Sequence, residues 1–291
     1  MCGLIHPMKK EMTPATPEET RAEVTRLAAR GYTQLRHILV QLPERDKPRA
    51  STVSKMLSGR QHRALLLYIL LLSAWPWLDG RREPLSAEVW IRALTAEGAP
   101  SWSASTLSRA WADLEDLHLI TKERDGRLAR VVPRREDGGE DYEVPGGRQD
   151  RWNAYFVLPD EFWNEKHFAK LSLPALVMLL VILKETNTPR TQEVWLTYEN
   201  AEGWYGIKPK SAQNGLTELQ ELGLLTRRRE TIKAPLSPTG KTFRTYYALT
   251  GPYAQSARAA ARAKASKERL KRLKVVAATT PEAISSAVPD S

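Results

Sequence analysis

Cysteine is nearly absent from the 291-residue sequence, which contains only Cys2. A single cysteine excludes an internal disulfide framework and a cysteine-based zinc cluster, and it is typical of proteins in a reducing compartment. The first residues also lack the apolar stretch of a secretory signal, because Lys9 and Lys10 follow only a few apolar side chains. We therefore expect a cytoplasmic protein.

Long hydrophobic runs are absent as well. The two most apolar stretches, 64–78 and 173–183, are shorter than the roughly 18–20 residues that a helix needs to cross a bilayer. We expect both to form buried core helices, and we expect no membrane partner. Three of the tryptophans, Trp90, Trp111 and Trp163, fall on apolar faces and are expected to pack in the core.

Recognisable catalytic and metal-binding patterns are missing. The five histidines show no paired spacing for a metal, and no Gly-x-Ser-x-Gly elbow occurs. The segment Gly240-Lys241-Thr242 ends like a phosphate-binding loop, but Pro235 stands where that loop needs its first glycine. We expect no enzyme activity, no cofactor, no metal and no small-molecule substrate.

Positive charge, by contrast, is abundant. The formal net charge is +10 and the sequence pI is about 9.7. This excess of cations favours a polyanionic partner such as nucleic acid, although a basic surface without a dedicated partner is the alternative. The length allows about two domains.

One pattern occurs twice, as LEDLHLITKER at 114–124 and LQELGLLTRRR at 219–229. In each copy leucines mark the inner face of a helix. A residue suited to a left-handed helix exit follows, His118 or Gly223, and basic residues come next. The repeat predicts that a helix leads directly into a basic β-hairpin at two places in the chain.

Two further helices are expected before each of these exits. Apolar spacing and the residues Ser86, Ser103 and Pro209, which suit helix starts, mark their positions. Together with the helix that ends at each exit, the expected helices cover 58–75, 84–94 and 102–120 in the first copy and 171–185, 196–207 and 208–225 in the second.

The N-terminal part is expected to hold one more helix, over about 17–42. Thr16 and Pro17 suit its start, apolar residues continue at helical spacing, and Pro43 ends it. The polar segment 43–57 is expected to be a connector.

The segment between the copies, 135–151, is rich in glycine, proline and acids. It is either a flexible linker or the tip of an extended wing in which 129–135 pairs with 152–163. We slightly favour the wing, because AYFVL within the latter has high strand propensity and needs a partner. After Pro252 an Ala-rich basic helix is expected, followed by a disordered end. The run from Arg258 to Lys274 either adds sequence-independent DNA affinity or is a solvated helix.

The sequence therefore predicts a mainly α-helical α+β fold with small β-hairpins. Three helices followed by a β-hairpin is the element order of a winged helix, and this order is expected twice. The expected parts are an N-terminal extension (1–57), a first winged helix (58–135), a linker or wing tip (136–151), a second winged helix (152–252) and a basic tail (253–291).

The third helix of a helix-turn-helix unit lies in the major groove, so its outer N-terminal half must carry small, polar or basic residues. Both copies fit, whereas an ordinary solvated face is the alternative for each helix taken alone. The candidate base-reading residues are Ser105, Thr106, Ser108, Arg109, Lys208, Lys210, Ser211, Gln213 and Asn214. The candidate phosphate contacts on the wings are Arg124, Arg127, Arg130, Arg227, Arg228, Arg229, Lys233, Lys241 and Arg244.

Through STLSRAWADLEDLHLITKERDGRLARVV and KSAQNGLTELQELGLLTRRRE with TFRTYYAL, the chain resembles the winged-helix DNA-binding superfamily over roughly 58–250. Two such units in tandem are similar to bacterial tandem winged-helix proteins, including plasmid replication initiators and helix-turn-helix regulators. The resemblance implies the fold and DNA binding. The first copy departs from the pattern through a longer connection before its third helix and fewer charges on it, so it either binds DNA or serves as a packing or dimerisation unit.

We accordingly expect a non-enzymatic protein that binds double-stranded DNA with sequence preference, associated with the nucleoid and acting as a transcriptional regulator. A replication initiator of a plasmid or mobile element is the first alternative, and a winged-helix protein-interaction module is the second. A homodimer is compatible with each.

Overall fold

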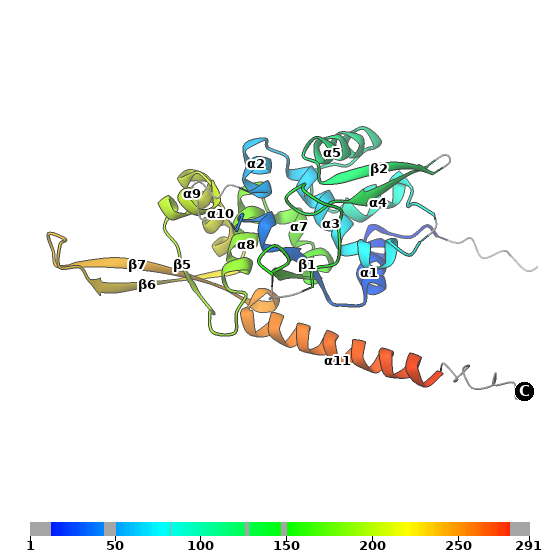
Figure 1. The fold of residues 1–291 in the computed structure, drawn as a ribbon. Helices are drawn as coiled ribbons and strands as arrows, with labels where there is room; N and C mark the ends of the chain where they lie inside the picture. Colours follow the sequence, from blue (N-terminus) through cyan, green and yellow to red (C-terminus); the bar gives the residue numbers. More distant parts are fainter. Residues whose placement is uncertain (1–12, 44–50, 82, 126–127, 147–149, 280–291) are drawn as a thin grey trace, which may run out of the picture.

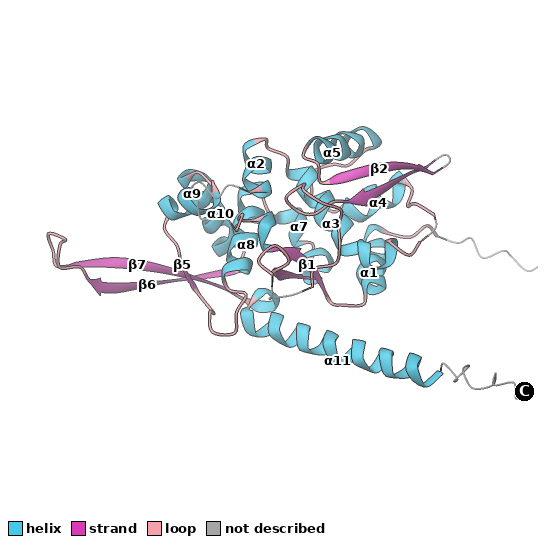
Figure 2. Ribbon diagram, viewed as in Figure 1, coloured by secondary structure: helices cyan, strands magenta, loops and turns pink. Residues whose placement is uncertain are grey.

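The computed structural model describes residues 13–43, 51–81, 83–125, 128–146 and 150–279. Within these residues helices predominate, and the strands form three small antiparallel sheets with the orders β1-β4, β2-β3 and β5-β7-β6. Figures 1 and 2 show the helices gathered into one body, from which the β6–β7 hairpin and the last helix project. The α+β class expected from the sequence is confirmed.

The first unit has the predicted order of three helices and a hairpin. The central helix is buried nearly all round, as its uninterrupted apolar sequence predicts. Ser103 caps the third helix by accepting a hydrogen bond from the backbone of Thr106. The elements are α3 (His62–Leu78), α4 (Ala87–Leu94), α5 (Ala104–Asp116), β2 (Ile120–Asp125) and β3 (Leu128–Pro133).

The second unit repeats this order and adds one short strand, which pairs with the second strand of the hairpin and so places that strand in the middle of the sheet. Pro209 occupies the first turn of the third helix, as expected. The elements are α8 (Leu173–Glu185), β5 (Val194–Trp195), α9 (Tyr198–Tyr205), α10 (Pro209–Glu221), β6 (Leu225–Lys233) and β7 (Lys241–Leu249).

The two helix exits that drew attention in the sequence have the same backbone geometry. His118 has φ 57° and Gly223 has φ 70°, which confirms the left-handed conformation expected at both positions. In each exit the next residue donates a hydrogen bond to a leucine carbonyl five residues earlier, at 2.9 Å in both copies. The repeat therefore encodes one way of turning a helix into a strand.

The predicted helix over 17–42 is wrong in its second half. α1 (Pro17–Ala28) begins with the expected Thr16–Glu19 capping box, but it ends where Ala29 adopts φ 54°. A strand follows, β1 (Tyr32–Arg36), and then a short 3-10 helix, η1 (His37–Leu39). Part of the predicted connector is also helical, as α2 (Thr52–Ser58).

The partner of β1 is β4 (Tyr155–Pro159), so the expected pairing of 129–135 with 152–163 is wrong too. Among the described residues β3 pairs with β2, the strand that precedes it in the expected hairpin. Both errors have one cause: the strand that pairs with β4 lies far upstream, with paired residues separated by 119 (Arg36↔Tyr155) to 127 positions (Tyr32↔Pro159).

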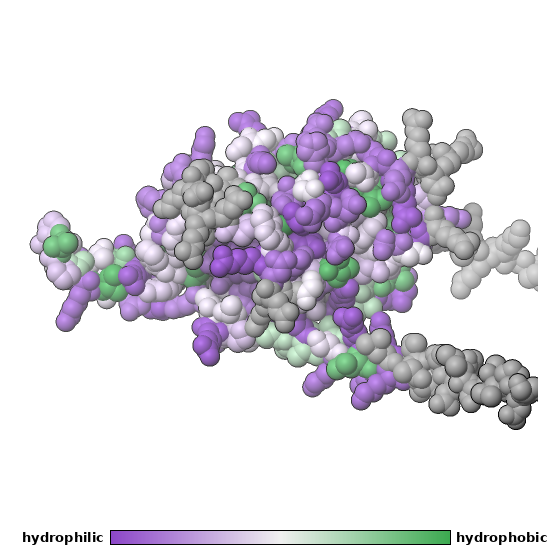
Figure 3. Space-filling model, viewed as in Figure 1, coloured by the Kyte–Doolittle hydropathy of each residue, from purple (hydrophilic) through white to green (hydrophobic). Residues whose placement is uncertain are grey.

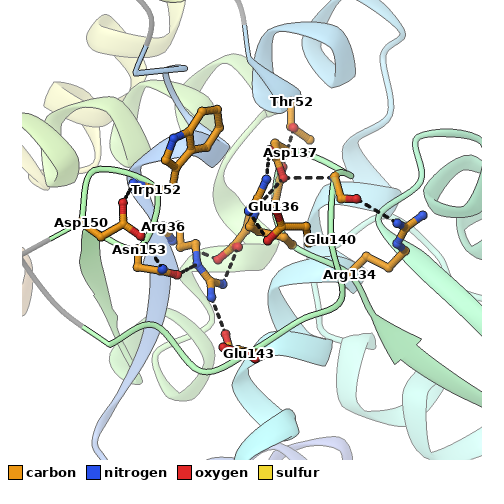
Figure 4. Close-up of polar contacts among 12 residues, drawn as sticks. Arg36, Thr52, Arg134, Glu136, Asp137, Glu140, Glu143, Asp150, Trp152 and Asn153 are labelled. Carbon is orange, nitrogen blue, oxygen red and sulfur yellow. Dashed lines mark hydrogen bonds and ion pairs between the residues drawn. The ribbon is translucent and has the colours of Figure 1, made fainter.

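The segment after β3 is anchored in the body by a buried ion pair between Glu136 and Arg36 (Figure 4). Arg36 Nη1 lies 2.8 Å from Glu136 Oε2, and the backbone N–H of Arg36 donates to Oε1 at 3.0 Å. Arg36 Nε donates to Asn153 Oδ1 at 3.0 Å, and its other nitrogen donates to the carbonyl of Glu143. Thr52 Oγ1 donates to the carbonyl of Glu136. The start of the predicted linker is therefore a fixed part of the fold.

The two units share one hydrophobic core rather than packing as separate bodies. The short helices α6 (Glu161–Asn164) and α7 (His167–Lys170) join it, and Trp163 Nε1 donates to Ser73 Oγ at 3.2 Å. Trp90 and Trp111 meet edge to face with centroids 5.5 Å apart, and all three of these tryptophans are buried, as expected.

The predicted basic helix is α11 (Gln255–Thr279), which follows the 3-10 turn η2 (Gly251–Tyr253) and leaves the body in the direction opposite to the β6–β7 hairpin in Figure 1. None of the helices in the described residues has the length and apolarity to cross a membrane.

Candidate nucleic-acid interface

The inner side of α10 is pressed closely against α8. Gly215 permits this approach, because a Cβ at that position would lie 2.4 Å from the carbonyl oxygen of Pro174. Ala212, Leu216 and Leu219 complete the buried stripe. Since successive side chains on a helix are 100° apart, this packing turns the residues between them toward solvent.

The outer side of α10 carries the candidate base-reading residues of the second unit. Lys208, Lys210, Gln213 and Asn214 are exposed, and Ser211 is half-buried. No acid occurs from 208 to 217. The first acid of the helix, Glu218, is hydrogen-bonded to Ser172, whose backbone N–H donates to Glu218 Oε1 at 2.6 Å. This contact occupies the Glu218 carboxylate. The result is a cationic, hydrogen-bonding surface on the N-terminal half of the helix.

The β6–β7 hairpin, which we call the long hairpin, pairs over nine residues on each strand and projects from the body (Figures 1 and 3). Most of its side chains are exposed. Residues 225–249 contain six Lys or Arg residues and one acid, Glu230.

Strand alternation divides these charges between two faces. The face that packs on the helices at its base, through Leu225, Tyr247 and Leu249, is here called the helix-side face. The opposite face, here called the outer face, carries Arg228, Glu230 and Arg244. The cations of the helix-side face are Arg227, Arg229, Lys233 and Lys241.

On the outer face the positive charge is largely neutralised. Arg228 is bound by both Glu193 and Glu230, with its Nε 3.2 Å from Glu193 Oε2 and its Nη1 3.1 Å from Glu230 Oε2. The Arg228 guanidinium lowers the pKa of Glu193, so this carboxylate stays ionised. Arg244 lies over the Trp195 ring, 5.2 Å from its centroid.

On the helix-side face no carboxylate of the described residues lies within ion-pair distance of the four cations. Arg229 lies 4.3 Å from the centroid of the Phe243 ring, which supports its guanidinium without removing its charge. The six predicted phosphate contacts of the long hairpin therefore fall into two groups that the sequence does not distinguish.

The first unit differs from the second in charge. Ser105, Ser108 and Arg109 of α5 are exposed, but Thr106 Oγ1 accepts a hydrogen bond from Ser103 N at 2.7 Å as part of the helix cap. Asp113 follows one turn after Arg109. Of these candidates, Arg109 is the single cation.

The β2–β3 hairpin directs its described cations toward acids. Arg130 Nη2 lies 3.8 Å from the carboxylate of Asp79, and Lys122 Nζ lies 2.6 Å from that of Glu115. Arg127 and the side chain of Arg124 lie outside the described residues. The described cations of this hairpin are thus engaged by acidic residues of the first unit.

A basic hollow that the sequence analysis missed lies beside α5. Three arginines line this space of about 390 Å³, together with His62 and one acid, Asp113; the arginines are Arg60, Arg63 and Arg109. Burial lowers the pKa of His62, Arg63 adds to this, and Glu218 opposes it. The chain signal was present as Arg60-Gln61-His62-Arg63, directly before the apolar run of α3.

The first cation of the basic tail, Arg258, packs into the body of the protein and is not exposed. Arg258 is completely buried and donates to the carbonyls of Leu183, Thr186 and Tyr253, at 3.2, 2.8 and 2.9 Å respectively. It thereby caps the C-terminal end of α8, and burial lowers its pKa to about 10. Arg258 is an anchor for α11 and not a contact for DNA, whereas Lys264, Lys267 and Arg269 are exposed.

No group of three or more His, Cys, Asp or Glu side chains that would hold a metal ion occurs in the part of the chain that the structure describes. Comparisons with protein-family models, with curated proteins and with solved structures found no match to this chain.

Proposed function

We propose that the chain is a non-enzymatic, sequence-preferring double-stranded DNA-binding protein of winged-helix type. In this proposal α10 lies in the major groove, with Gln213 and Asn214 on base edges, because their side chains suit adenine. The helix-side face of the long hairpin contacts phosphates. The first unit has a supporting role.

The segregation of charge on the long hairpin carries this proposal. Ion pairing occupies Arg228 on the outer face, whereas the four cations on the helix-side face have no carboxylate of the described residues within ion-pair distance. Leaving like charges unpaired on one ribbon destabilises the isolated protein slightly, and a polyanion on that side compensates for it. A protein-interaction module accounts for the same arrangement only if its partner presents an acidic surface.

Transcriptional regulation is the role we propose. A replication initiator would use the same surfaces, and the two roles differ in where the bound sites lie. Mapping of occupied sites on the DNA of the source cell distinguishes them: single sites beside promoters indicate regulation, and an array of repeated sites at an origin indicates initiation.

A salt series on the full chain tests the DNA-binding proposal. With a mixed-sequence duplex, log affinity should fall steeply with log salt concentration, and Arg229→Gln should reduce the slope by about 1. Arg228→Gln is the matched control, since it removes the same charge from the neighbouring position but on the outer face; its slope should equal that of the parent chain. Absence of binding at low salt contradicts the proposal, and equal effects of the two variants contradict the assignment of faces.

The base-reading assignment has its own test. On a duplex selected from a random library, Gln213→Ala or Asn214→Ala should weaken binding by about 1–3 kcal/mol per lost base contact. On unselected DNA both variants should bind like the parent chain. Arg229→Gln is the contrast, because a lost phosphate contact weakens binding to both kinds of duplex. If the α10 variants lose affinity equally on both, these residues do not read bases.

A further inference from the structure

The free end of the long hairpin, residues 234–240, is an ordered pair of β-turns. The first closes where Ser237 N donates to the Ala234 carbonyl at 2.9 Å, and the second where Gly240 N donates to the Ser237 carbonyl at 3.0 Å. Pro235 and Pro238 occupy the second position of each turn, where their fixed φ is favourable.

Further hydrogen bonds tie this tip to the strands. Ala234 N donates to the Gly240 carbonyl at 2.9 Å, and the hydroxyls of Ser237 and Thr239 both donate to the Lys241 carbonyl, at 2.9 and 3.0 Å. Gly240 closes the tip with φ 68°. The tip is therefore pre-organised, and it presents its remaining side chains in fixed directions.

The side chain so presented is Leu236, whose relative exposure of 102% is the highest among the exposed large hydrophobic residues. Figure 3 shows hydrophobic surface at the free end of the otherwise mostly hydrophilic hairpin. A leucine at this point contributes nothing to the core. A single exposed leucine is ordinary on a protein surface, so its exposure does not by itself indicate a function.

Two lysines flank the tip that carries Leu236. Lys233 and Lys241 are directly opposite each other at the last rung of the ladder, and both are exposed. Like charges facing each other across two strands destabilise the hairpin. An anion beside the two lysines offsets their mutual repulsion. The backbone of DNA supplies such anions, because its phosphates are closely spaced along each strand.

We propose that Leu236 is a wedge that enters the minor groove of DNA and partly unstacks a base step, with Lys233 and Lys241 holding the phosphates beside it. This inference rests on the DNA-binding function proposed above. Apolar residues used in this way by minor-groove proteins include leucine, and they kink the duplex by about 20–90°. Arg229, on the same face and nearer the body, follows the phosphate backbone that leads to the wedge.

Ring closure of DNA by ligase measures the kink. On a mixed-sequence fragment of about 150 base pairs, close to one persistence length, saturation with the full chain should raise the rate of ring closure by about tenfold. Leu236→Ser should remove this increase, and Leu236→Met should retain it, because methionine is also an apolar wedge. Thymines in the bound region should react with permanganate when the parent chain is bound and not with Leu236→Ser.

Affinity for the same DNA is measured in parallel, so that two kinds of failure stay distinct. Leu236→Ser should keep its affinity within about threefold, since the cationic contacts supply most of the binding free energy. Because the side chain of Leu236 is fully exposed, the substitution removes no packing. If the parent chain binds without accelerating ring closure, or if Leu236→Ser accelerates it equally, the wedge is wrong and the DNA-binding proposal stands. If the parent chain does not bind, both are wrong.

Discussion

Replacing Glu136 by alanine is expected to lower the free energy of unfolding by about 3–5 kcal/mol, because it leaves the charge of Arg36 buried without its partner. The side chains of both residues are almost completely inaccessible, at 1% and 0% exposure for Arg36 and Glu136. Burial raises the pKa of Glu136 and Arg36 opposes this rise, so the pair is a balance between desolvation and attraction.

Urea denaturation followed by circular dichroism measures the effect, and two variants make it specific. Glu23→Ala removes the partner of an exposed arginine, Arg26, and should leave the unfolding midpoint almost unchanged. The double variant Arg36→Met/Glu136→Leu removes both charges and should recover most of the lost stability. If Glu136→Ala unfolds no more easily than Glu23→Ala, the pair does not hold the segment after β3 in place.

Local signals made the helix–hairpin order predictable. The stripe of leucines along α10, the left-handed residue at Gly223 and the basic residues beyond it all lie within 21 positions of one another, from Pro209 to Arg229. Such features depend on neighbours in the chain, so periodicity and turn chemistry reveal them. The same reasoning located His118 in the first unit.

The β1–β4 sheet was not predictable in the same way. Leu35 and Ile38 fit the helical spacing of the preceding apolar residues, yet Ala29 and Gly31 both have positive φ and end the helix before them. What makes 32–36 a strand is its pairing with 155–159, and a partner so distant leaves no local pattern. The burial of Glu136 follows from the same sheet, since Arg36 ends β1.

The residues of the candidate interface were predictable from the sequence. Which of their cations form ion pairs, and which do not, was not predictable. In the sequence Arg228 and Arg229 are equivalent neighbours, yet Glu193, 35 residues away, binds Arg228 and not Arg229. Arg258 begins the run for which the sequence left DNA affinity and a solvated helix as alternatives, and its side chain fits neither, because it is buried against α8. Net charge is a property of composition, but which cations remain available depends on tertiary contacts.

The close packing of α10 on α8 makes Gly215 the position most sensitive to added volume. Gly215→Ala is expected to lower the free energy of unfolding by about 1–3 kcal/mol, because the new methyl meets the backbone of Pro174 at 2.4 Å and Met178 Cγ at 2.8 Å. This loss should appear even though alanine gains up to about 1 kcal/mol from helix propensity.

Gly203→Ala is the matched control, because Gly203 is also helical and a Cβ there meets nothing within 4 Å. It should raise the free energy of unfolding by about 0.5–1 kcal/mol in the same denaturation experiment. Gly215→Ala should in addition reduce the preference for selected over unselected DNA, since relieving the clash moves α10 and with it Gln213 and Asn214. If both glycine variants are stabilising, α10 does not lie as close to α8 as described, and the positions of the base-reading side chains would have to be revised.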